Sequence, residues 1–355
     1  MNLHYSPFEY KKGLEDYLEL FKNAFPEVTD NSGDAYFWQM HSYPNEKTHS
    51  YEYSAHIDNL MVGYYAAIPY RYNIKNETVD VGMVCGVMTS SHYRGKGIFT
   101  KLGAYSLQNL KQNVSFTTGY PIRKEVIPGH LKVGWKIAFQ LPLYMKFVRT
   151  NSLFRTKAKF LLFLAPVANI ILRIIFFLIK TKIKNNQYHI SVSNHISDFR
   201  KMEKFESNWV NSIPISLIRD EKFIKWRYGR PGASYKFITV QKEDEVIGFC
   251  SYRKIIKEGV PSFGIMDLRV LDNNVVVLSN IFYSLEQQAK KENVDALMLM
   301  ISKSYAKKYN LRKNGYLKSP YKFSLIINNL QQRFNDNFLY DESNWHLMWV
   351  DSDDL

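Results

Sequence analysis

The alternation of apolar and polar positions predicts strands and helices in mixed order over the first 150 residues. Apolar residues that recur every three or four positions are typical of amphipathic helices, and short apolar runs bounded by glycine, proline or polar pairs are typical of strands. The predicted elements are a helix over 14–25, strands over 53–57, 61–72 and 78–89, a helix from Ile98, a strand over 114–121, a short helix ending near Gly134 and a strand over 141–150. Asp58 and Asn59 form a turn signal, so we expect a hairpin between the first two strands.

The second half of the chain repeats this order in outline. The polar residues Lys242, Glu243 and Asp244 separate two strand-like runs and predict a second hairpin. The predicted elements are strands over 234–240, 245–253, 263–271, 294–302 and 321–327 and helices over 275–289 and 304–314. No sequence period accompanies the repeat, so it concerns architecture alone. We expect an α/β fold with a mixed, partly antiparallel sheet.

A segment of different character separates the two halves. Residues 160–179 are mostly apolar and approach the length of about 18 residues that a membrane span requires. They include Pro166, Asn169 and Arg173, and basic residues flank both ends. We predict a first domain over 1–150, a hydrophobic and basic helical insertion over 151–190, a second domain over 191–330 and a tail over 331–355.

Composition limits the class of protein and of partner. Hydrophobic residues make up 46% and charged residues 23% of the chain, which argues against a disordered or fibrous protein. The formal net charge of +14 favours an anionic partner without choosing among nucleotide, phosphate, membrane and nucleic acid. Cys85 and Cys250 lie far apart in apolar runs, and the first residues lack a signal-peptide pattern. A cytoplasmic protein without disulfides or zinc is the simpler interpretation.

The sharpest chemical signal lies where the third predicted strand gives way to a helix. Residues 93–102 read YRGKGIFTKL. A helix N-terminus offers unpaired N–H donors and the positive end of a dipole, and glycine lets the backbone approach an anion closely. Arg94, Lys96 and Lys101 add positive charge. The combination suits a pyrophosphate group, and the alternative is a capped turn with solvated lysines.

This segment resembles the pyrophosphate loop of the GNAT superfamily of N-acetyltransferases, Gln/Arg-x-x-Gly-x-Gly/Ala. Arg94 and Gly97 stand at its first two fixed positions, and Phe99 stands where glycine or alanine is usual. The resemblance covers roughly residues 35–150 and implies a GNAT fold there, followed by a second, degenerate GNAT-like domain. The two-domain length also resembles members found in bacterial surface-polysaccharide gene clusters.

The resemblance implies an acetyl-CoA site. In GNAT enzymes the strand before the loop diverges from its neighbour, and its amides hold the pantetheine arm and polarise the thioester carbonyl. Gly86 permits the bulge that this divergence needs. The implied site consists of Val87, Met88, Thr89, Arg94, Gly95, Lys96, Gly97, Ile98, Phe99 and Thr100. Direct transfer to an amine needs neither a metal nor a Cys or Ser nucleophile.

The general acid and base are not fixed by this resemblance. The amine must lose a proton before it attacks, and the departing thiolate must be stabilised. The tyrosine that family members often carry on the helix after the fifth strand is absent here. His130, whose residue type has a suitable intrinsic pKa, Glu125, Tyr120 and Asp80 are the candidates. Each has an ordinary structural or surface role as its alternative.

Two regions are predicted to serve other purposes. Residues 268–274, which correspond to the loop in the second half, contain no glycine, so this half is expected to complete the acceptor pocket or to stabilise the fold. Residues 160–179 are a membrane span, a helix buried between the domains, or an interfacial helix. A span places Arg173 near the bilayer centre at a cost of roughly 2.5–3.5 kcal/mol and separates the two halves. The other two interpretations are equally favoured.

The interfacial interpretation rests on a polar stripe along the helix. The stripe consists of Asn169, Arg173, Lys180 and Lys184. It predicts peripheral contact of 155–184 with an anionic membrane at its cytoplasmic face.

We therefore expect an acetyl-CoA-dependent N-acetyltransferase whose acceptor is an amino sugar, nucleotide- or lipid-linked, in glycan assembly. An aminoacyl transferase of the FemAB type is one alternative, but such enzymes usually lack an intact pyrophosphate loop. A non-catalytic protein that binds a membrane or nucleic acid is the other. Because the lysines are spread along the chain and no aromatic-basic RNA motif stands out, we expect no nucleic-acid partner.

Overall fold

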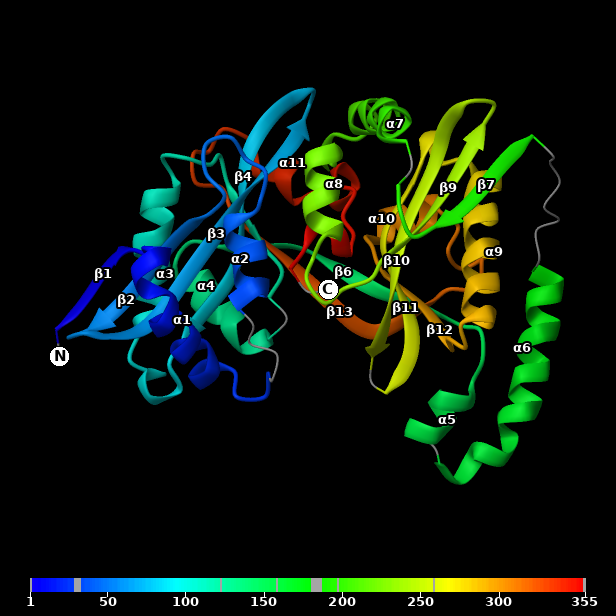
Figure 1. The fold of residues 1–355 in the computed structure, drawn as a ribbon, viewed down its shortest axis with the longest axis horizontal. Helices are drawn as coiled ribbons and strands as arrows, with labels where there is room; N and C mark the ends of the chain where they lie inside the picture. The colour runs from blue at the N-terminus through cyan, green and yellow to red at the C-terminus, as the bar shows by residue number, and fades with distance from the viewer. Residues whose placement is uncertain are drawn as a thin grey trace.

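The computed structural model describes residues 2–28, 33–121, 123–157, 159–179, 187–196, 198–257 and 259–353 (Figure 1). Up to residue 150 the elements are β1 (Leu3–Pro7), α1 (Tyr10–Ala24), α2 (Gly33–His41), β2 (Tyr51–Ile57), β3 (Leu60–Ile74), β4 (Glu77–Thr89), α3 (Ile98–Leu110), β5 (Thr117–Gly119), α4 (Ile127–Lys132) and β6 (Lys136–Phe147). They are followed by α5 (Asn151–Lys157), the 3₁₀ helix η3 (Lys159–Leu164), α6 (Ala165–Ile179), β7 (Tyr188–Ser193), α7 (Phe199–Asn211), β8 (Ile215–Leu217), α8 (Glu221–Tyr228), β9 (Lys236–Lys242), β10 (Glu245–Lys257), β11 (Val260–Val270), α9 (Val275–Lys291), β12 (Ala296–Met300), α10 (Lys303–Lys308), β13 (Leu317–Asn328) and α11 (Asp336–Tyr340).

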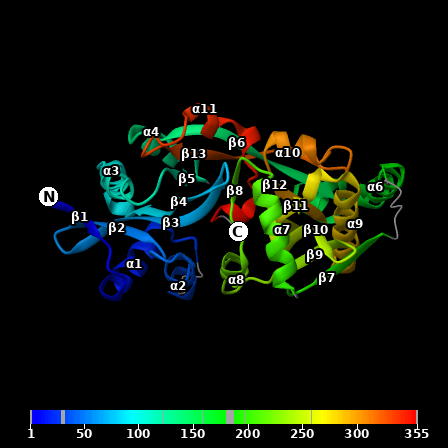
Figure 2. The same ribbon diagram turned by 90° about the horizontal axis from the view of Figure 1, so that it is seen from above.

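The strands of the described residues form one mixed sheet of thirteen strands. Their order is β1-β2-β3-β4-β5-β13-β6-β12-β11-β10-β9-β7, and β8 pairs with β3 off this path. Neighbouring strands are antiparallel except for β4–β5 and β11–β12, which are parallel. The predicted α/β fold with a mixed sheet is confirmed (Figures 1 and 2).

Each half of the chain supplies one strand that pairs with a strand of the other half: β13 pairs with β5, and β6 pairs with β12. The last strand, β13, lies between β5 and β6, and β6 in turn pairs with β12. Figure 1 shows β6 in green and β13 in orange crossing the middle of the molecule. The sheet therefore continues from one half into the other. The predicted domain boundaries at 150 and 191 stay a prediction, but both halves share this junction.

The two halves repeat one arrangement around the β13–β6 pair. In each half a parallel pair of strands is held by three residue pairs, from Gly82–Thr117 to Val84–Gly119 in the first and from Ser262–Ala296 to Gly264–Met298 in the second. The first strand of each parallel pair also has a register shift against the strand before it, β4 against β3 and β11 against β10. The repeat expected from the order of elements is therefore present in the topology.

Helices cover both faces of the first-half strands. α1 and α2 pack on one face and α3 on the other, as Figure 2 shows from above. β3 is consequently buried at every position from Met61 to Tyr70. In the second half α9 packs along β9, β10, β11 and β12. The core beneath α1 and α2 continues through the junction into the second half.

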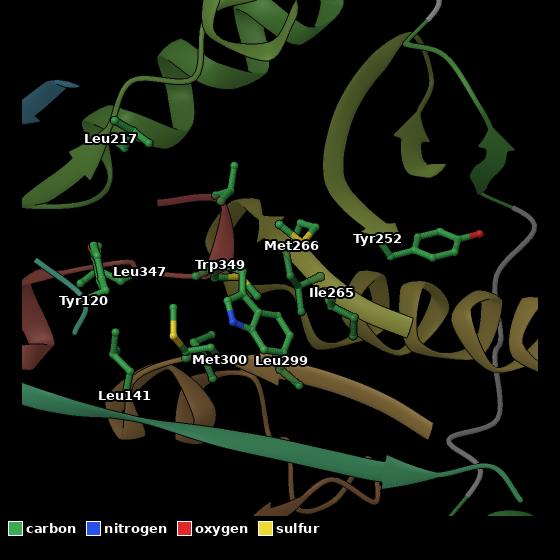
Figure 3. Close-up of a cluster of buried hydrophobic side chains, with 14 of the residues drawn as sticks. Tyr120, Leu141, Leu217, Tyr252, Ile265, Met266, Leu299, Met300, Leu347 and Trp349 are labelled. Atoms are coloured by element: carbon green, nitrogen blue, oxygen red, sulfur yellow. The ribbon is translucent and has the colours of Figure 1, made fainter. Parts of the chain in front are cut away.

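The C-terminal segment, residues 345–353, runs into the middle of the core. Trp345 and Trp349 are fully buried. In Figure 3 the ring of Trp349 lies among Met266 of β11 and Leu299 and Met300 of β12. The segment predicted as part of a tail is therefore an integral part of the packing between the halves.

Several element boundaries differ from the predicted ones for local reasons. α10 ends at Lys308 instead of extending to 314, because Asn310 adopts a positive φ of 49°. β5 spans three residues, and its pairing with β4 ends at Val84–Gly119, just before Gly86. β1, α2, β7, α7, β8, α8 and α11 were not predicted.

Residues 159–179 form η3 and α6 at the end of the molecule away from the N-terminus (Figures 1 and 2). In the part of the chain that the structure describes, no helix combines the length and apolarity needed to cross a bilayer. The interpretation as a helix buried between the domains is wrong, because the outward residues Val167, Ile170, Ile171 and Ile174 are exposed.

Candidate cofactor cleft

β4 bulges and leaves β5 at the position predicted from its glycine. Gly86 has a φ of +63°, and the register between β3 and β4 shifts beside it, between Tyr64 and Ala66. A Cβ at Gly86 would lie 3.2 Å from Cε1 of Tyr64 and 3.3 Å from Cε of Met40. The backbone conformation therefore favours glycine, and a side chain here would also require Tyr64 and Met40 to shift. The residues after the bulge, 87–89, form one wall of an opening.

The loop before α3 presents a row of unpaired backbone N–H groups. Gly95 and Gly97 have φ values of +78° and +76°, and Gly97 caps α3, whose first intrahelical bond runs from Lys101 N to Gly97 O. Within the described residues, no protein acceptor receives a hydrogen bond from the N–H groups of 94–100. A Cβ on Gly95 would meet no atom within 4 Å. These donors are therefore free to bind an anion at the positive end of the α3 dipole.

A cleft of about 650 Å³ lies between the end of β4 and this loop. All residues of the predicted acetyl-CoA site line it except Lys96. The remaining wall comes from Ala24, Phe25, Tyr93, Arg123, Glu125, Val126, Gly129 and Lys132. Its volume falls within the range of about 300–1,000 Å³ that is usual for cofactor sites.

The basic side chains of the loop differ in what they contact. Arg94 Nη2 donates to the carbonyl oxygen of Ala24 at 2.8 Å and so joins the loop to the C-terminal end of α1. Lys96 Nζ lies 4.7 Å from the ring centroid of Tyr93. Arg123 lines the cleft and pairs with Glu27. Arg94 is thus partly a structural residue, and Lys96 lies over the ring of Tyr93 without lining the cleft itself.

Phe99, the departure from the family motif, is accommodated by Gly129 of α4. A Cβ at residue 129 would lie 2.5 Å from Cε1 of Phe99, a separation that real Cβ atoms do not show. The Phe99 ring also meets His130 edge-on at 4.9 Å between centroids. Gly129 was not predicted as a site residue, although it makes room for the larger side chain of Phe99 because it has no side chain itself.

The acid–base candidates do not come together. Glu125 is exposed and lines the cleft. His130 is buried between Phe99 and Trp135, and its neighbour Gly129 lines the cleft in its place. This placement favours Glu125 over His130 for a role that requires contact with substrate.

Tyr120 and Asp80 lie outside the cleft. Tyr120 is buried in the core (Figure 3), and burial raises the pKa of its hydroxyl well above the usual value. Asp80 lies on the opposite half of β4, where its Oδ2 is 2.9 Å from Lys47 Nζ, and it lines a separate polar cavity of about 460 Å³. Neither side chain faces the loop before α3, and all four roles stay predictions.

His130 makes the fold sensitive to acid. Burial lowers its pKa to about 4, whereas the unfolded chain has an ordinary value near 6.5. The contribution of the neutral ring to stability is therefore complete above pH 6.5 and is lost as the pH falls toward 4. Between pH 7 and pH 4.5 we expect the free energy of unfolding in urea to fall by about 2 kcal/mol more in the wild type than in His130→Leu. An equal fall in both proteins would contradict this assignment.

In the second half, protein side chains occupy the place that the cleft occupies in the first. β11 bulges at Met266, between the pairs Ser251–Asp267 and Tyr252–Ile265. The C-terminal segment packs there, with Trp349 beside Met266 in Figure 3. Arg227 donates to the backbone carbonyls of Trp349, Val350 and Ser352.

A buried ionic network fixes this segment. Arg219 Nη2 donates to both carboxylate oxygens of Asp351, at 2.9 and 2.8 Å. Asp267 on β11 contacts Arg219 and also Arg269, whose Nε lies 2.8 Å from its Oδ2, and Arg269 pairs with Glu206 on α7. All five side chains are buried. The network joins α7, β11 and the C-terminal segment.

A small cavity of about 40 Å³ beside β3 is lined by residues that were not predicted from the sequence. Trp38 of α2 and Trp226 of α8 stack at 5.0 Å, and each indole N–H donates to the other residue's backbone carbonyl. Arg230 and Asp353 line the same cavity. The pKa of the buried Cys85 thiol on β4 is raised by burial and then by the charge of Asp353. These residues come from four separate parts of the chain, and no local motif joins them.

Comparison with known proteins agrees with this architecture. The family model described as an acetyltransferase (GNAT) domain matches residues 9–138. No curated protein matches the sequence.

Solved structures match nearly the whole chain at low identity. A GCN5-related N-acetyltransferase from Anabaena variabilis aligns with a TM-score of 0.66 and 11% identity over 93% of this chain and 73% of that one. A probable N-acyltransferase from Enterococcus faecalis gives 0.65 and 14% over 93% and 74%, and an N-myristoyltransferase from Saccharomyces cerevisiae with bound myristoyl-CoA gives 0.59 and 11% over 92% and 82%. The chain thus has the same fold as these solved acyltransferase structures, and its residues 9–138 match the family model for a GNAT acetyltransferase domain.

Proposed function

We propose that this protein is an acyl-CoA-dependent N-acyltransferase with acetyl-CoA as its donor. One observation carries the proposal: the cleft beside the end of β4 is open, and the N–H groups of 94–100 that border it have no protein acceptor. A loop that only capped a helix would need neither two glycines with positive φ nor free N–H donors beside a cleft of this size.

The residues present fit a coenzyme A molecule. The diphosphate would bind the N–H groups from Gly95 to Phe99, where glycine leaves room for close approach. The pantetheine arm would follow 87–89, which line the cleft past the bulge. Lys132 and Arg123 add positive charge at the opposite wall. When bound, acyl-CoA would supply an acyl group activated as a thioester.

The chain's own contribution to the reaction is positioning and proton handling. Glu125 is the candidate that lines the cleft, so we assign to it the removal of a proton from the incoming amine, directly or through water. Backbone donors after Gly86 would stabilise negative charge on the carbonyl oxygen. Tyr120 and His130 are buried away from this point and would act on the shape of the site instead.

An amino sugar, nucleotide- or lipid-linked, is the acceptor class that we propose, in the setting of glycan assembly. The support is the resemblance to two-domain members of surface-polysaccharide clusters. An aminoacyl transferase of the FemAB type is the second candidate. The unpaired donors of the loop favour the first, because a phosphate-binding loop serves coenzyme A.

Release of free thiol from acetyl-CoA in the presence of an amine tests the proposal. We expect thiol release with at least one member of a panel of amino sugars, and thermal stabilisation by coenzyme A alone, since a ligand that binds the native state raises the unfolding temperature. Glu125→Gln is expected to lower kcat by about 10²–10⁴-fold with little effect on coenzyme A binding. Stabilisation by aminoacyl-tRNA but not by coenzyme A would overturn the proposal.

A further inference from the structure

The outer face of η3 and α6 is apolar and exposed. Phe160 and Phe163 on η3 are 79% and 72% exposed. On α6 the side chains of Val167, Ile170, Ile171 and Ile174 are each more than half exposed. The α6 positions follow the spacing of one helical face, so they form a continuous stripe with the phenylalanines at one end. We call these six residues the α6 apolar face.

The opposite face of α6 is fixed to the protein. Ala165 is buried, and Asn169 Oδ1 accepts hydrogen bonds from the backbone N and the hydroxyl of Thr150 at 2.8 and 3.0 Å. Asn169 Nδ2 donates to Asn151 Oδ1 at 2.7 Å. Asn169 therefore faces the protein. The prediction that it belongs to a polar stripe facing the membrane surface is wrong for this residue. The side chain of Arg173 and residues 180–186, with Lys180 and Lys184, lie outside the described residues.

Charge decides what covers the α6 apolar face. Residues 126–197 contain no Asp or Glu, while Arg155 and the exposed Lys159 stand directly before the face and Lys180, Lys182 and Lys184 follow it in the sequence. A second copy docked through the same face would bring these like charges together. An anionic lipid surface would bury the α6 apolar face among its acyl chains and attract the basic residues on both sides of it to its headgroups.

We propose that η3 and α6 dock the protein on an anionic membrane, with α6 parallel to the surface and its apolar face among the lipid chains. α6 is about 22 Å long, which suits a helix lying in the plane of the interface. Figures 1 and 2 both place α6 at the outer end of the molecule, so a flat surface can approach it. The proposal goes beyond the acyltransferase assignment and does not rest on it.

Vesicle flotation tests this docking. The full-length protein is expected to float with vesicles of phosphatidylcholine and phosphatidylglycerol and to stay behind with phosphatidylcholine alone. Ile170→Ser/Ile174→Ser should lower the fraction that floats at least tenfold. Arg155→Gln/Lys159→Gln should do the same in the anionic vesicles. Urea midpoints equal to that of the wild type establish that the variants are folded.

A matched control separates this face from general surface apolarity. Leu60 and Ile137 are exposed apolar residues in the first half, 47% and 46% exposed, and Leu60→Ser/Ile137→Ser should leave flotation unchanged. Wild-type protein that ignores anionic vesicles would overturn the proposal. So would a dimer in light scattering that the Ile170→Ser/Ile174→Ser variant abolishes, because the face then binds a second copy. Thiol release with a soluble acceptor is expected to be unchanged in that variant, which keeps this test distinct from that of the enzymatic activity.

Discussion

Gly97→Asp is expected to weaken coenzyme A binding at least about 100-fold. The new side chain has room, since the nearest atoms to its Cβ are Thr100 Oγ1 at 3.9 Å and Lys101 Cε at 4.0 Å, so its carboxylate would stand among the free N–H groups. Two like charges about 4 Å apart near a protein surface repel by about 4 kcal/mol, and each 1.4 kcal/mol is tenfold in affinity. Calorimetric titration with coenzyme A measures the effect.

Gly232 provides a matched control for this substitution. It has a φ of +71°, and a Cβ there would meet no atom within 4 Å, so Gly232→Asp imposes the same backbone strain and adds the same charge in the turn before β9. Both variants should lose roughly 1–2 kcal/mol of stability, but Gly232→Asp should bind coenzyme A as the wild type does. Equal affinity in the two variants would show that the cofactor does not contact the start of α3.

Arg219→Met is expected to destabilise the protein by roughly 3–5 kcal/mol, because it leaves two buried carboxylates, Asp351 and Asp267, without this partner. The loss should release the C-terminal segment from its place beside β11 and increase its cleavage by protease. The free energy of unfolding from urea titration measures the first effect, and limited proteolysis followed by mass spectrometry measures the second.

An exposed ion pair serves as the comparison. Lys136→Met removes the salt bridge from Lys136 Nζ to Asp336 Oδ2. This bridge is 2.9 Å long, similar to the Arg219–Asp351 contacts, but it lies at the surface, so its loss should cost about 1 kcal/mol or less. Arg219→Met/Asp351→Leu should be more stable than Arg219→Met alone, since it removes one unpaired charge as well. If Arg219→Met costs no more than Lys136→Met, the network does not hold the segment.

The cofactor cleft could be predicted from the sequence because its chemistry is local. Gly86, Gly95 and Gly97 each adopt the positive φ that the bulge and the loop require, and all three lie within a dozen residues of one another. A strand that ends in a glycine-bearing loop before an amphipathic helix brings its donors together without help from distant segments. The hairpins and α3 were predictable for the same reason.

The contacts between distant segments could not be predicted in this way. The pairing of β13 with β5 and the insertion of Trp349 beside Met266 join residues far apart in sequence, and apolar periodicity states only that a residue is buried, not against what. His130 shows the same limit. Its residue type suggested a base, but its burial between two aromatic rings depends on how α4 packs.

The position of β13 has a consequence for synthesis on the ribosome. β5 and β6 are complete by residue 147, yet the strand that separates them ends only at residue 328. At roughly 5–20 residues per second, the two strand edges that β13 later covers stay unpaired for about 10–40 s. Such edges invite pairing with other chains, so this protein is expected to depend on chaperones during translation more than a protein whose sheet closes in chain order.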